Sequence, residues 1–228
     1  MKKKLTFYSE AAYIAGIILL ALGTALMEQA DFGLSMVVAP AYLLHLKISQ
    51  YLPFFSFGMA EYTLQAVIIV LLSAVLRKFK PAYLFSFVTA VAYGFTLDGF
   101  MALVAVLPLA GTAAMTAGYI LGFVLCAMGV AFLFHTYIPP EAYELFVKEV
   151  SVKLGKDISV VKTIYDCCSC LVGILLSFAF FGFGHFEGVK LGTLICALFN
   201  GFLIGLFTKA LERRWEFKDG LFLRKYFQ

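Results

Sequence analysis

Charged residues are scarce in this chain. Asp, Glu, Lys and Arg make up only 14% of its 228 residues, against about 25% in typical soluble domains. Hydrophobic residues make up 62%, and the mean hydropathy is +0.93. A soluble core of this length cannot take up so much apolar surface, so the sequence predicts that the lipid bilayer surrounds most of the chain.

Sequence motifs for catalysis are lacking as well. The chain has no Gly-rich phosphate loop, no paired-histidine motif and no serine elbow. His45, His135 and His185 are scattered, and none is spaced to share a helical face with another. We therefore expect neither an enzyme nor a bound cofactor.

Cysteines are few and odd in number. All 5 fall inside predicted membrane helices, at Cys126, Cys167, Cys168, Cys170 and Cys196. Their number and placement argue against a disulfide framework. Structural zinc sites usually take their thiolates from cysteine pairs in loops. We expect no metal site and interpret these residues as small side chains that let helices pack closely.

Long apolar runs dominate what is present. Six of them cover residues 11–27, 55–76, 82–107, 113–134, 159–181 and 191–211. Each approaches or meets the roughly 17–25 residues that a membrane-spanning helix needs. The first run ends in Met27-Glu28-Gln29 without a small-residue cleavage site, which favours a retained helix over a signal peptide. The sequence predicts an all-α polytopic membrane protein with six transmembrane helices.

Basic residues mark one side of this six-span topology. Only Lys47 and Lys190 fall on the other side. The positive-inside rule then places both termini in the cytoplasm. We expect the basic residues to bind no nucleic acid, because no folded basic face lies outside the membrane. The residues on the basic side are Lys2, Lys3, Lys4, Arg77, Lys78, Lys80, Lys148, Lys153, Lys156, Lys209, Arg213, Arg214, Lys218, Arg224 and Lys225.

The two halves of the chain echo each other. Residues 22–27 resemble 128–133, residues 90–95 resemble 197–202, and Ser56 and Tyr62 are echoed by Ser159 and Tyr165. Because each unit has an odd number of spans, the second must be inverted relative to the first. Inverted repeats are common in secondary transporters, whose binding site lies between the halves.

This echo predicts how a single membrane domain is divided. Residues 1–109 form the first three-helix repeat and residues 110–211 form the second, inverted one. Residues 212–228 form a cytoplasmic tail rich in basic and aromatic residues, which we expect to lie along the inner leaflet.

A further segment follows the first helix of each repeat. Residues 32–46 are apolar but too short to span the membrane and return, so we expect a re-entrant or interfacial segment broken at Gly33 and Pro40. In the second repeat, Pro139-Pro140-Glu141 is typical of a helix start. We expect an amphipathic helix there that either packs the repeat together or acts as a gate. Its expected ion pairs are Glu144 with Lys148 and Glu149 with Lys153.

Four short motifs carry a resemblance to a known group. They are Gly23-Thr24-Ala25-Leu26, Ala30-Asp31-Phe32-Gly33-Leu34-Ser35, Pro139-Pro140-Glu141-Ala142-Tyr143 and residues 192–201. With them the chain resembles the YczE/YitT-like group of uncharacterised bacterial integral membrane proteins over most of its length. The resemblance implies a duplicated six-span plan in the bacterial inner membrane. It implies no activity, because the group has none firmly assigned.

Polar side chains inside the spans are the candidate solute-binding residues. A charge at mid-helix costs roughly 2.5–3.5 kcal/mol on insertion scales, so such residues normally face the interior of the bundle. The alternative is purely structural: Asp98 and Asn200 would bond neighbouring helices, and Asp166 would pair with Lys162 on its own helix. Glu61 and Gln65 share one helical face. The predicted solute-binding set is Asp98, Asn200, Tyr93, Glu61 and Asp166.

Further polar residues lie at the expected mouths of the cavity. Glu28 and Asp31 close the first helix on the outer side, and Tyr137, Glu141 and Tyr143 hold the matching place on the inner side. The alternative interpretation is that they are ordinary polar residues of surface loops. If the neighbouring segments re-enter the protein, the same side chains line a gate.

Together these features predict a transporter of a small polar solute that works by alternating access. Acidic residues outnumber basic ones in the spans, which favours a cationic solute or proton coupling. One alternative is a scaffold, regulator or binding subunit that acts with a partner subunit or as a homo-oligomer. Another is a lipid-handling protein, whose cavity would open sideways to the bilayer.

Overall fold

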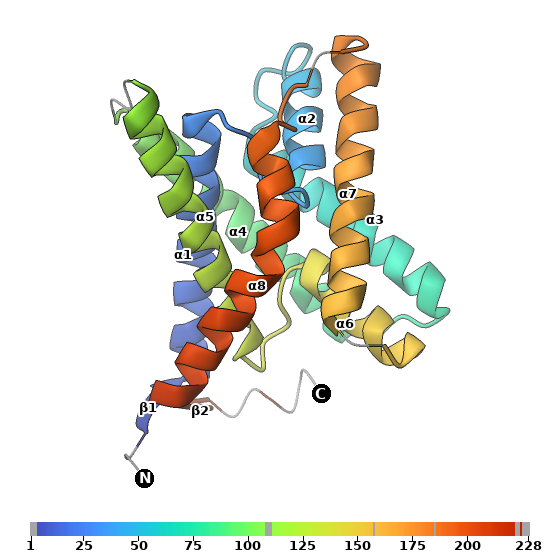
Figure 1. Ribbon diagram of the computed structural model, residues 1–228. Coiled ribbons are helices and arrows are strands. Elements are labelled where there is room, and N and C mark those ends of the chain that lie inside the picture. Colours follow the sequence, from blue (N-terminus) through green and yellow to red (C-terminus); the bar gives the residue numbers. More distant parts are fainter. Residues whose placement is uncertain (1–3, 108–110, 157, 185, 222–223, 225–228) are drawn as a thin grey trace.

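The computed structural model describes residues 4–107, 111–156, 158–184, 186–221 and 224. Within these residues the chain forms eight helices and two short strands (Figure 1). In chain order they are β1 (Leu5–Tyr8), α1 (Ser9–Ala30), α2 (Ala39–Ile48), α3 (Phe57–Leu76), α4 (Ala82–Val104), α5 (Thr112–Phe134), α6 (Ala142–Leu154), α7 (Ile158–Phe181), α8 (Leu191–Arg214) and β2 (Trp215–Lys218).

Six of the helices in the described part of the chain are long and apolar enough to cross a membrane. They are α1, α3, α4, α5, α7 and α8, and each coincides with one of the six predicted runs. The predicted all-α multi-pass plan is thus confirmed at this level. The ends differ by a few residues: α4 already ends at Val104, and α8 continues to Arg214. The predicted boundary at 109/110 lies outside the described residues.

Helices α1 and α5 pack most closely, through glycines. A Cβ atom on Gly23 would lie 2.6 Å from the Gly122 carbonyl oxygen, and one on Gly16 would lie 3.0 Å from that of Gly129. The early glycine of each helix thus meets the late glycine of the other, so the two helices run antiparallel. Small residues permit such backbone contact, which stabilises helix pairs in membranes. Helix α4 packs on α1, and α8 packs on α5.

The short helices α2 and α6 lie toward opposite ends of the bundle (Figure 1). We name the end with both chain termini the terminal face, and the end near α2 the opposite face. Helix α2 packs on α3 and α7, whereas α6 packs on α3, α4 and α7. The predicted helix after Pro139-Pro140-Glu141 is confirmed as α6.

The segment before α2 is buried without being helical. Leu34 and Met36 are buried there, and Gly33 has a φ of +107°, which favours glycine. The predicted break at Gly33 is therefore seen. The predicted break at Pro40 is wrong, because Pro40 lies in the first turn of α2, where its missing N–H costs nothing.

The two strands were not predicted from the sequence. β1 and β2 pair in parallel, with Leu5 opposite Trp215 and Tyr8 opposite Lys218. Phe7 packs against the rings of Trp215 and Phe217. The start of the predicted tail therefore packs against the N-terminal strand. Residues 222–223 and 225–228 of that tail lie outside the described residues.

Candidate functional site

A buried polar cluster lies where α3 meets the start of α6. Glu61 and Gln65 are both 0% exposed and lie one turn apart on α3. The Gln65 Nε2 atom donates to Glu61 Oε2 at 3.4 Å and to Glu141 Oε2 at 3.3 Å. Its Oε1 atom accepts from the backbone N–H of Ala142 at 3.0 Å. One amide side chain thus joins two carboxyl groups and fixes the first turn of α6.

The two carboxyl groups of this cluster have few partners. The hydroxyl of Tyr143 donates to Glu61 Oε2 at 2.8 Å. Among the described residues, the Oε1 atoms of Glu61 and Glu141 have no hydrogen-bond partner. Burial raises the pKa of Glu141 well above its ordinary value, and the nearby carboxyls of Glu61 and Glu144 raise it further. Both effects disfavour the ionised form of Glu141.

On the α7 side the buried acids have a cation. The Nζ atom of Lys162 lies 3.3 Å from Glu144 Oε1 and 3.0 Å from Asp166 Oδ1. The predicted pairing of Lys162 with Asp166 within one helix is thus confirmed, and Glu144 joins it from α6. The predicted pairing of Glu144 with Lys148 is wrong, because packing against α7 offers a buried partner instead. The predicted pairing of Glu149 with Lys153 is wrong as well, because Glu149 pairs with Lys80, at 2.6 Å.

A cavity of about 30 Å³ lies beside this cluster. That volume is enough for about one water molecule. Tyr93 and Asn200, which were predicted as site residues, both line it. The Tyr93 hydroxyl donates to Thr24 Oγ1 at 3.0 Å. The full lining is Leu20, Thr24, Ser35, Val37, Val38, Tyr93, Cys126, Val130, Glu141, Tyr143, Glu144 and Asn200.

The structure thus brings most of the predicted solute-binding set together. Glu61 is linked to the cavity-lining Glu141 through Gln65, across two hydrogen bonds. Asp166 reaches the cavity-lining Glu144 through Lys162.

Asp98, the remaining member of the predicted solute-binding set, lies elsewhere in the structure. Its carboxylate accepts from Ser56 Oγ at 2.6 Å and from the backbone N–H of Gly58 at 2.8 Å. It is not among the residues that line the cavity. A carboxylate at this place satisfies free N–H groups of the first turn of α3 and interacts favourably with the helix dipole. The structural interpretation of Asp98 fits this geometry.

At the opposite face, the segment after α1 is joined to the segment before α8. Asp31 Oδ1 lies 2.6 Å from Lys190 Nζ. Backbone N–H groups of Leu34 and Gly192 donate to the carbonyls of Gly188 and Phe32, at 3.1 and 2.9 Å. The predicted mouth residue Glu28 accepts from the Tyr42 hydroxyl at 3.2 Å. These contacts hold the two segments together at this face.

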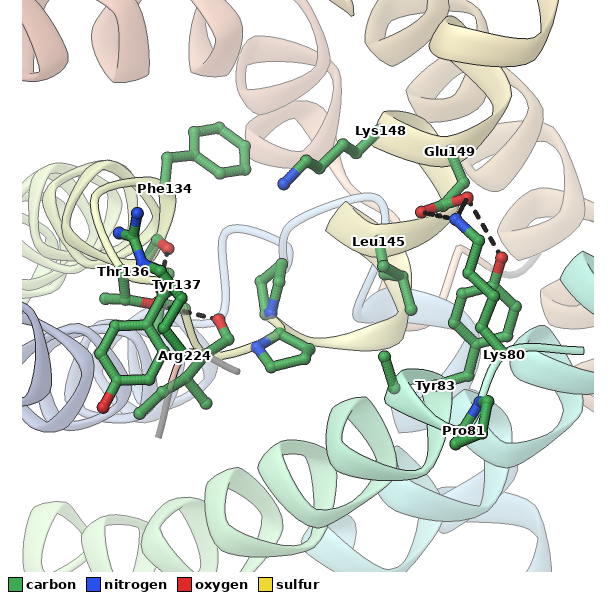
Figure 2. A pocket seen from close by; sticks show the side chains of 15 residues that line it. Lys80, Pro81, Tyr83, Phe134, Thr136, Tyr137, Leu145, Lys148, Glu149 and Arg224 are labelled. Atoms are coloured by element: carbon green, nitrogen blue, oxygen red, sulfur yellow. Dashed lines mark hydrogen bonds and ion pairs between the residues drawn. The ribbon is translucent and has the colours of Figure 1, made fainter. Parts of the chain in front are cut away.

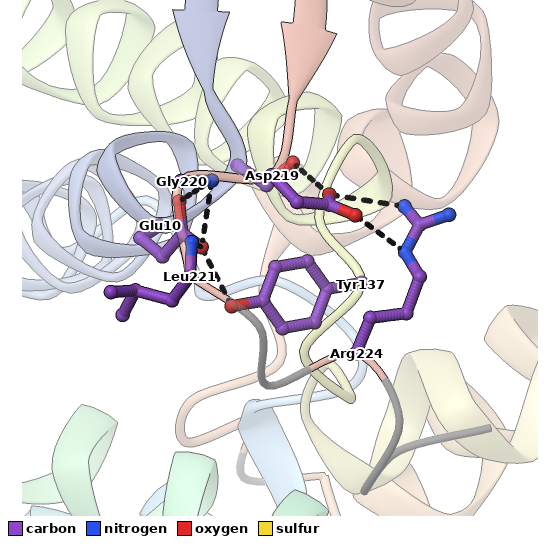
Figure 3. Close-up of polar contacts among 7 residues, drawn as sticks. Glu10, Tyr137, Asp219, Gly220, Leu221 and Arg224 are labelled. Atoms are coloured by element: carbon purple, nitrogen blue, oxygen red, sulfur yellow. Dashed lines mark hydrogen bonds and ion pairs between the residues drawn. The ribbon is translucent and has the colours of Figure 1, made fainter.

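Glu10 joins three segments at the terminal face (Figure 3). It accepts from the Tyr137 hydroxyl at 2.6 Å and from the backbone N–H of Leu221 at 2.8 Å. Asp219 lies 2.7 Å from the guanidinium of Arg224. Burial, together with the Glu10 carboxylate, raises the pKa of Tyr137 to about 12. The predicted mouth residue Tyr137 thus ties the end of α5 to both chain ends, through a glutamate that the sequence did not single out.

A hollow of about 850 Å³ opens near the same face. Lys80, Tyr83 and Glu149 gather on one side of it, with Tyr137 and Arg224 on the other (Figure 2). Its lining also includes Pro139 and Pro140.

The two prolines separate this hollow from the buried cluster. Ser86 Oγ donates to the Pro140 carbonyl at 2.6 Å, and Thr89 Oγ1 donates to that of Pro139 at 2.9 Å. Helix α4 thus holds the segment that leads into Glu141.

A groove of about 660 Å³ runs between α7 and α8. Lys162, Asp166 and Cys167 line it from α7. Gly201 and Gly205 line it from α8, and a Cβ atom on either glycine would meet no atom within 4 Å. The rest of the lining is mostly apolar, and the groove reaches the buried ion pairs from the side.

Metal ligands do not cluster in the part of the chain that the structure describes. No group there combines three or more His, Cys, Asp or Glu side chains in a way that could hold an ion. The cluster offers carboxyl, amide and phenol groups, which are chemically able to hold protons and to bind cationic or polar ligands.

Comparison with known proteins gives one family. Residues 7–209 match the family of unknown function DUF6198. No curated protein and no solved structure matches the chain.

Proposed function

We propose that this chain, which belongs to the family of unknown function DUF6198, is a membrane transporter of a small polar solute that works by alternating access. The solute carries a positive charge or moves together with protons. The observation that supports this best is the small cavity lined by Tyr93, Asn200, Glu141 and Glu144, with the other buried acids directly behind it. Such ionisable residues inside a membrane bundle typically mark solute or ion pathways.

The transporter proposal includes an inverted repeat of residues 1–109 and 110–211. The echo of residues 22–27 in 128–133 aligns Gly23 with Gly129, and the same register aligns Gly16 with Gly122. Exchanging the two halves then turns the Gly16–Gly129 contact into the Gly23–Gly122 contact. The packing of α2 on α7 and of α6 on α3 is related in the same way. A pseudo-twofold axis between α1 and α5 accounts for both pairs of contacts.

The proposed location is the bacterial inner membrane, with both termini in the cytoplasm. The positive-inside pattern supports this orientation. The ends of α1 and α8 that carry β1 and β2 lie together at the terminal face, as an even number of spans requires. The resemblance to the YczE/YitT-like group supports the bacterial membrane.

In this proposal the structure corresponds to a state closed on both sides. Asp31 and Lys190 bridge the opposite face, while Glu10 and Tyr137 bridge the terminal face. The cavity of about 30 Å³ is too small for a solute much larger than water. Alternating access then requires that one bridge opens at a time, with α2 and α6 moving as the gating segments that follow α1 and α5.

The test starts from purified full-length protein. Thermal-shift screening against a library of small cationic and neutral metabolites identifies a ligand, and flux of that ligand is then measured in proteoliposomes. Asn200→Ala and Tyr93→Phe are expected to lower both the thermal shift and the flux at least tenfold. Glu149→Gln, on the terminal-face surface of α6, is the matched control and keeps both. A stoichiometric partner that co-purifies, with no flux of any ligand, contradicts the proposal.

The groove between α7 and α8 favours a second candidate, a lipid-handling protein. Its apolar lining and its position between two membrane helices suit an acyl chain. Native mass spectrometry of protein extracted in mild detergent tests this. A phospholipid that is retained by the unmodified protein and lost in Gly201→Leu supports lipid handling, whereas a protein free of lipid contradicts it.

A further inference from the structure

We infer that Glu61 and Glu141, joined by Gln65, form a proton-binding site that holds a proton at neutral pH. The inference deepens the proposed function, because it names the ion that would couple to the solute. The existence of the proton site can be tested without any transport.

Negative side chains outnumber positive ones in the buried cluster. Four acids, Glu61, Glu141, Glu144 and Asp166, are at most 6% exposed. They face one buried base, Lys162, which pairs with Glu144 and Asp166. An uncompensated buried charge is costly, and removing one partner of a buried pair leaves such a charge behind. Glu61 and Glu141 make no ion pair with any described residue, so protons are the simplest way to neutralise them.

Few hydrogen-bond donors surround the carboxyl groups of Glu61 and Glu141. The donors that reach the pair are the Gln65 amide and the Tyr143 hydroxyl, and both bond Oε2 atoms. The two Oε1 atoms are left without a partner in the described structure. An ionised carboxylate can only accept, whereas a protonated carboxyl needs fewer donors around it. Two carboxyl groups that share a buried site also repel each other when both are ionised, which favours a proton on one of them.

The other titratable groups facing this pair come from several helices. Tyr13 on α1, Tyr93 on α4, Tyr143 on α6 and Tyr165 on α7 all interact with one or both carboxyls. Phenols ordinarily ionise only near about pH 10. Lys162 remains held between its two acids. The Cys126 thiol of α5 also lines the cavity, but thiols ordinarily ionise only near about pH 8.5. Glu144 and Asp166 share the charge of Lys162. We therefore assign a proton taken up or released here near neutral pH to the two carboxyl groups without a cation, Glu61 and Glu141.

The position of the two carboxyl groups allows the proton to couple to solute binding. Glu141 lines the cavity, whereas Glu61 lies behind Gln65. A positive group that enters the cavity would favour ionised Glu141, so its arrival would release the proton. The pair would then exchange a proton for the charge of the solute. No three-ligand set for a metal ion is present among the described residues, which favours a proton over a metal cation.

Infrared spectroscopy of the full-length protein in liposomes tests the inference directly. A protonated buried carboxyl gives a C=O stretching band that shifts in D₂O. We expect this band at pH 7 in the unmodified protein. It should weaken in Glu141→Gln and disappear in the double variant Glu61→Gln/Glu141→Gln. Glu149→Gln, which removes a carboxyl group of the same helix α6, should leave it unchanged.

Three results would overturn the inference. The band is absent at pH 7, or it persists at full strength in the folded double variant, or it appears only when sodium is withheld. The last result would assign the site to Na⁺. Folding of each variant is checked by gel filtration in the same detergent. A protonated pair in a protein that moves no solute would refute the proposed transport and keep the proton site, so the two failures are distinguishable.

Discussion

Helices α3 and α4 pack backbone against backbone, whereas a groove separates α7 from α8. We call the α3–α4 interface the closed seam and the α7–α8 interface the open seam. In the closed seam, Gly58 and Gly94 bring the two backbones together, and a Cβ atom on Gly94 would lie 2.7 Å from the Gly58 carbonyl oxygen. In the open seam, Gly201 and Gly205 face empty space along a groove of about 660 Å³. The sequence echo of residues 90–95 in 197–202 aligns Gly94 with Gly201. The same residue at matched positions permits close packing in one half and leaves room in the other.

The buried acids beside the two seams differ in a related way. On the α3 side, Glu61 meets only an amide and a phenol. On the α7 side, Asp166 and Glu144 bond Lys162, which also lines the groove. The acid beside the closed seam, Glu61, thus has no cationic partner. The acids beside the open seam, Glu144 and Asp166, are paired with Lys162. In the proposed inverted repeat the two halves are thus chemically distinct, a difference that the proposed carrier of a charged solute would use.

Removing the cation beside the open seam should have the largest effect. Lys162→Met leaves Glu144 and Asp166 buried without their partner, and breaking one side of a buried ion pair costs about 3–5 kcal/mol. We expect a matching fall in the free energy of unfolding, measured by denaturant titration in detergent. Lys209→Met, on the exposed rim of the same groove, is the control and should change little. Equal losses in the two variants would show that Lys162 is not the partner these acids require.

The aligned glycines test the seams themselves. Gly94→Ala forces a methyl group against the α3 backbone and should destabilise the protein by about 1–3 kcal/mol. Gly201→Ala meets no atom and gains helix propensity, so it should be neutral or stabilising by up to about 1 kcal/mol. Thermal unfolding of both variants in one detergent makes the comparison. Similar losses would mean that the α7–α8 seam closes in solution.

Much of the fold could be predicted from the sequence because membrane spans depend on length and hydrophobicity alone. The six helices, α6 and the Lys162–Asp166 pair follow from such local patterns. The pairing of Tyr93 with Asn200 at one cavity came from the echo between the halves. The helices and the ion pair depend on residues close in sequence, and the placement of Tyr93 and Asn200 depends on the repeated sequence pattern.

What the sequence could not give depends on contacts between distant residues. Asp98 looks like a mid-span charge, yet it bonds the start of α3. Glu144 has a suitable lysine four residues on, yet α7 offers it a buried one. Glu10 resembles an ordinary surface residue until the C-terminal segment folds back onto it. Local spacing cannot decide such cases, because several partners are possible and only packing selects one.

The pH dependence of stability should sharpen the contrast between the two groups of acids. The pKa of Glu141 is raised in the folded protein, so the folded state holds a proton that the unfolded state loses above its ordinary value of 4.5. The free energy of unfolding should therefore fall as pH rises above that value, by up to about 1.4 kcal/mol per unit. Glu141→Gln should flatten this slope, and Glu149→Gln should not. Denaturant titrations between about pH 5 and pH 8 provide the measurement, and an unchanged slope in Glu141→Gln would contradict the shift.

The smallest expected effect is a change in the rate at which Cys167, beside the open seam, is labelled. Cys167 lines the groove and is exposed, whereas Cys126 and Cys196 are buried. A lipid-soluble maleimide should therefore modify Cys167 in the native protein and leave the three buried thiols, of Cys126, Cys170 and Cys196, unmodified, as read by mass spectrometry of peptides. Gly201→Leu fills the groove and should slow labelling of Cys167 severalfold. Cys168 is exposed but does not line the groove, so its labelling is the internal control. If both thiols slow together, or neither does, the space beside Gly201 does not lead to Cys167, and the contrast between the seams loses its main support.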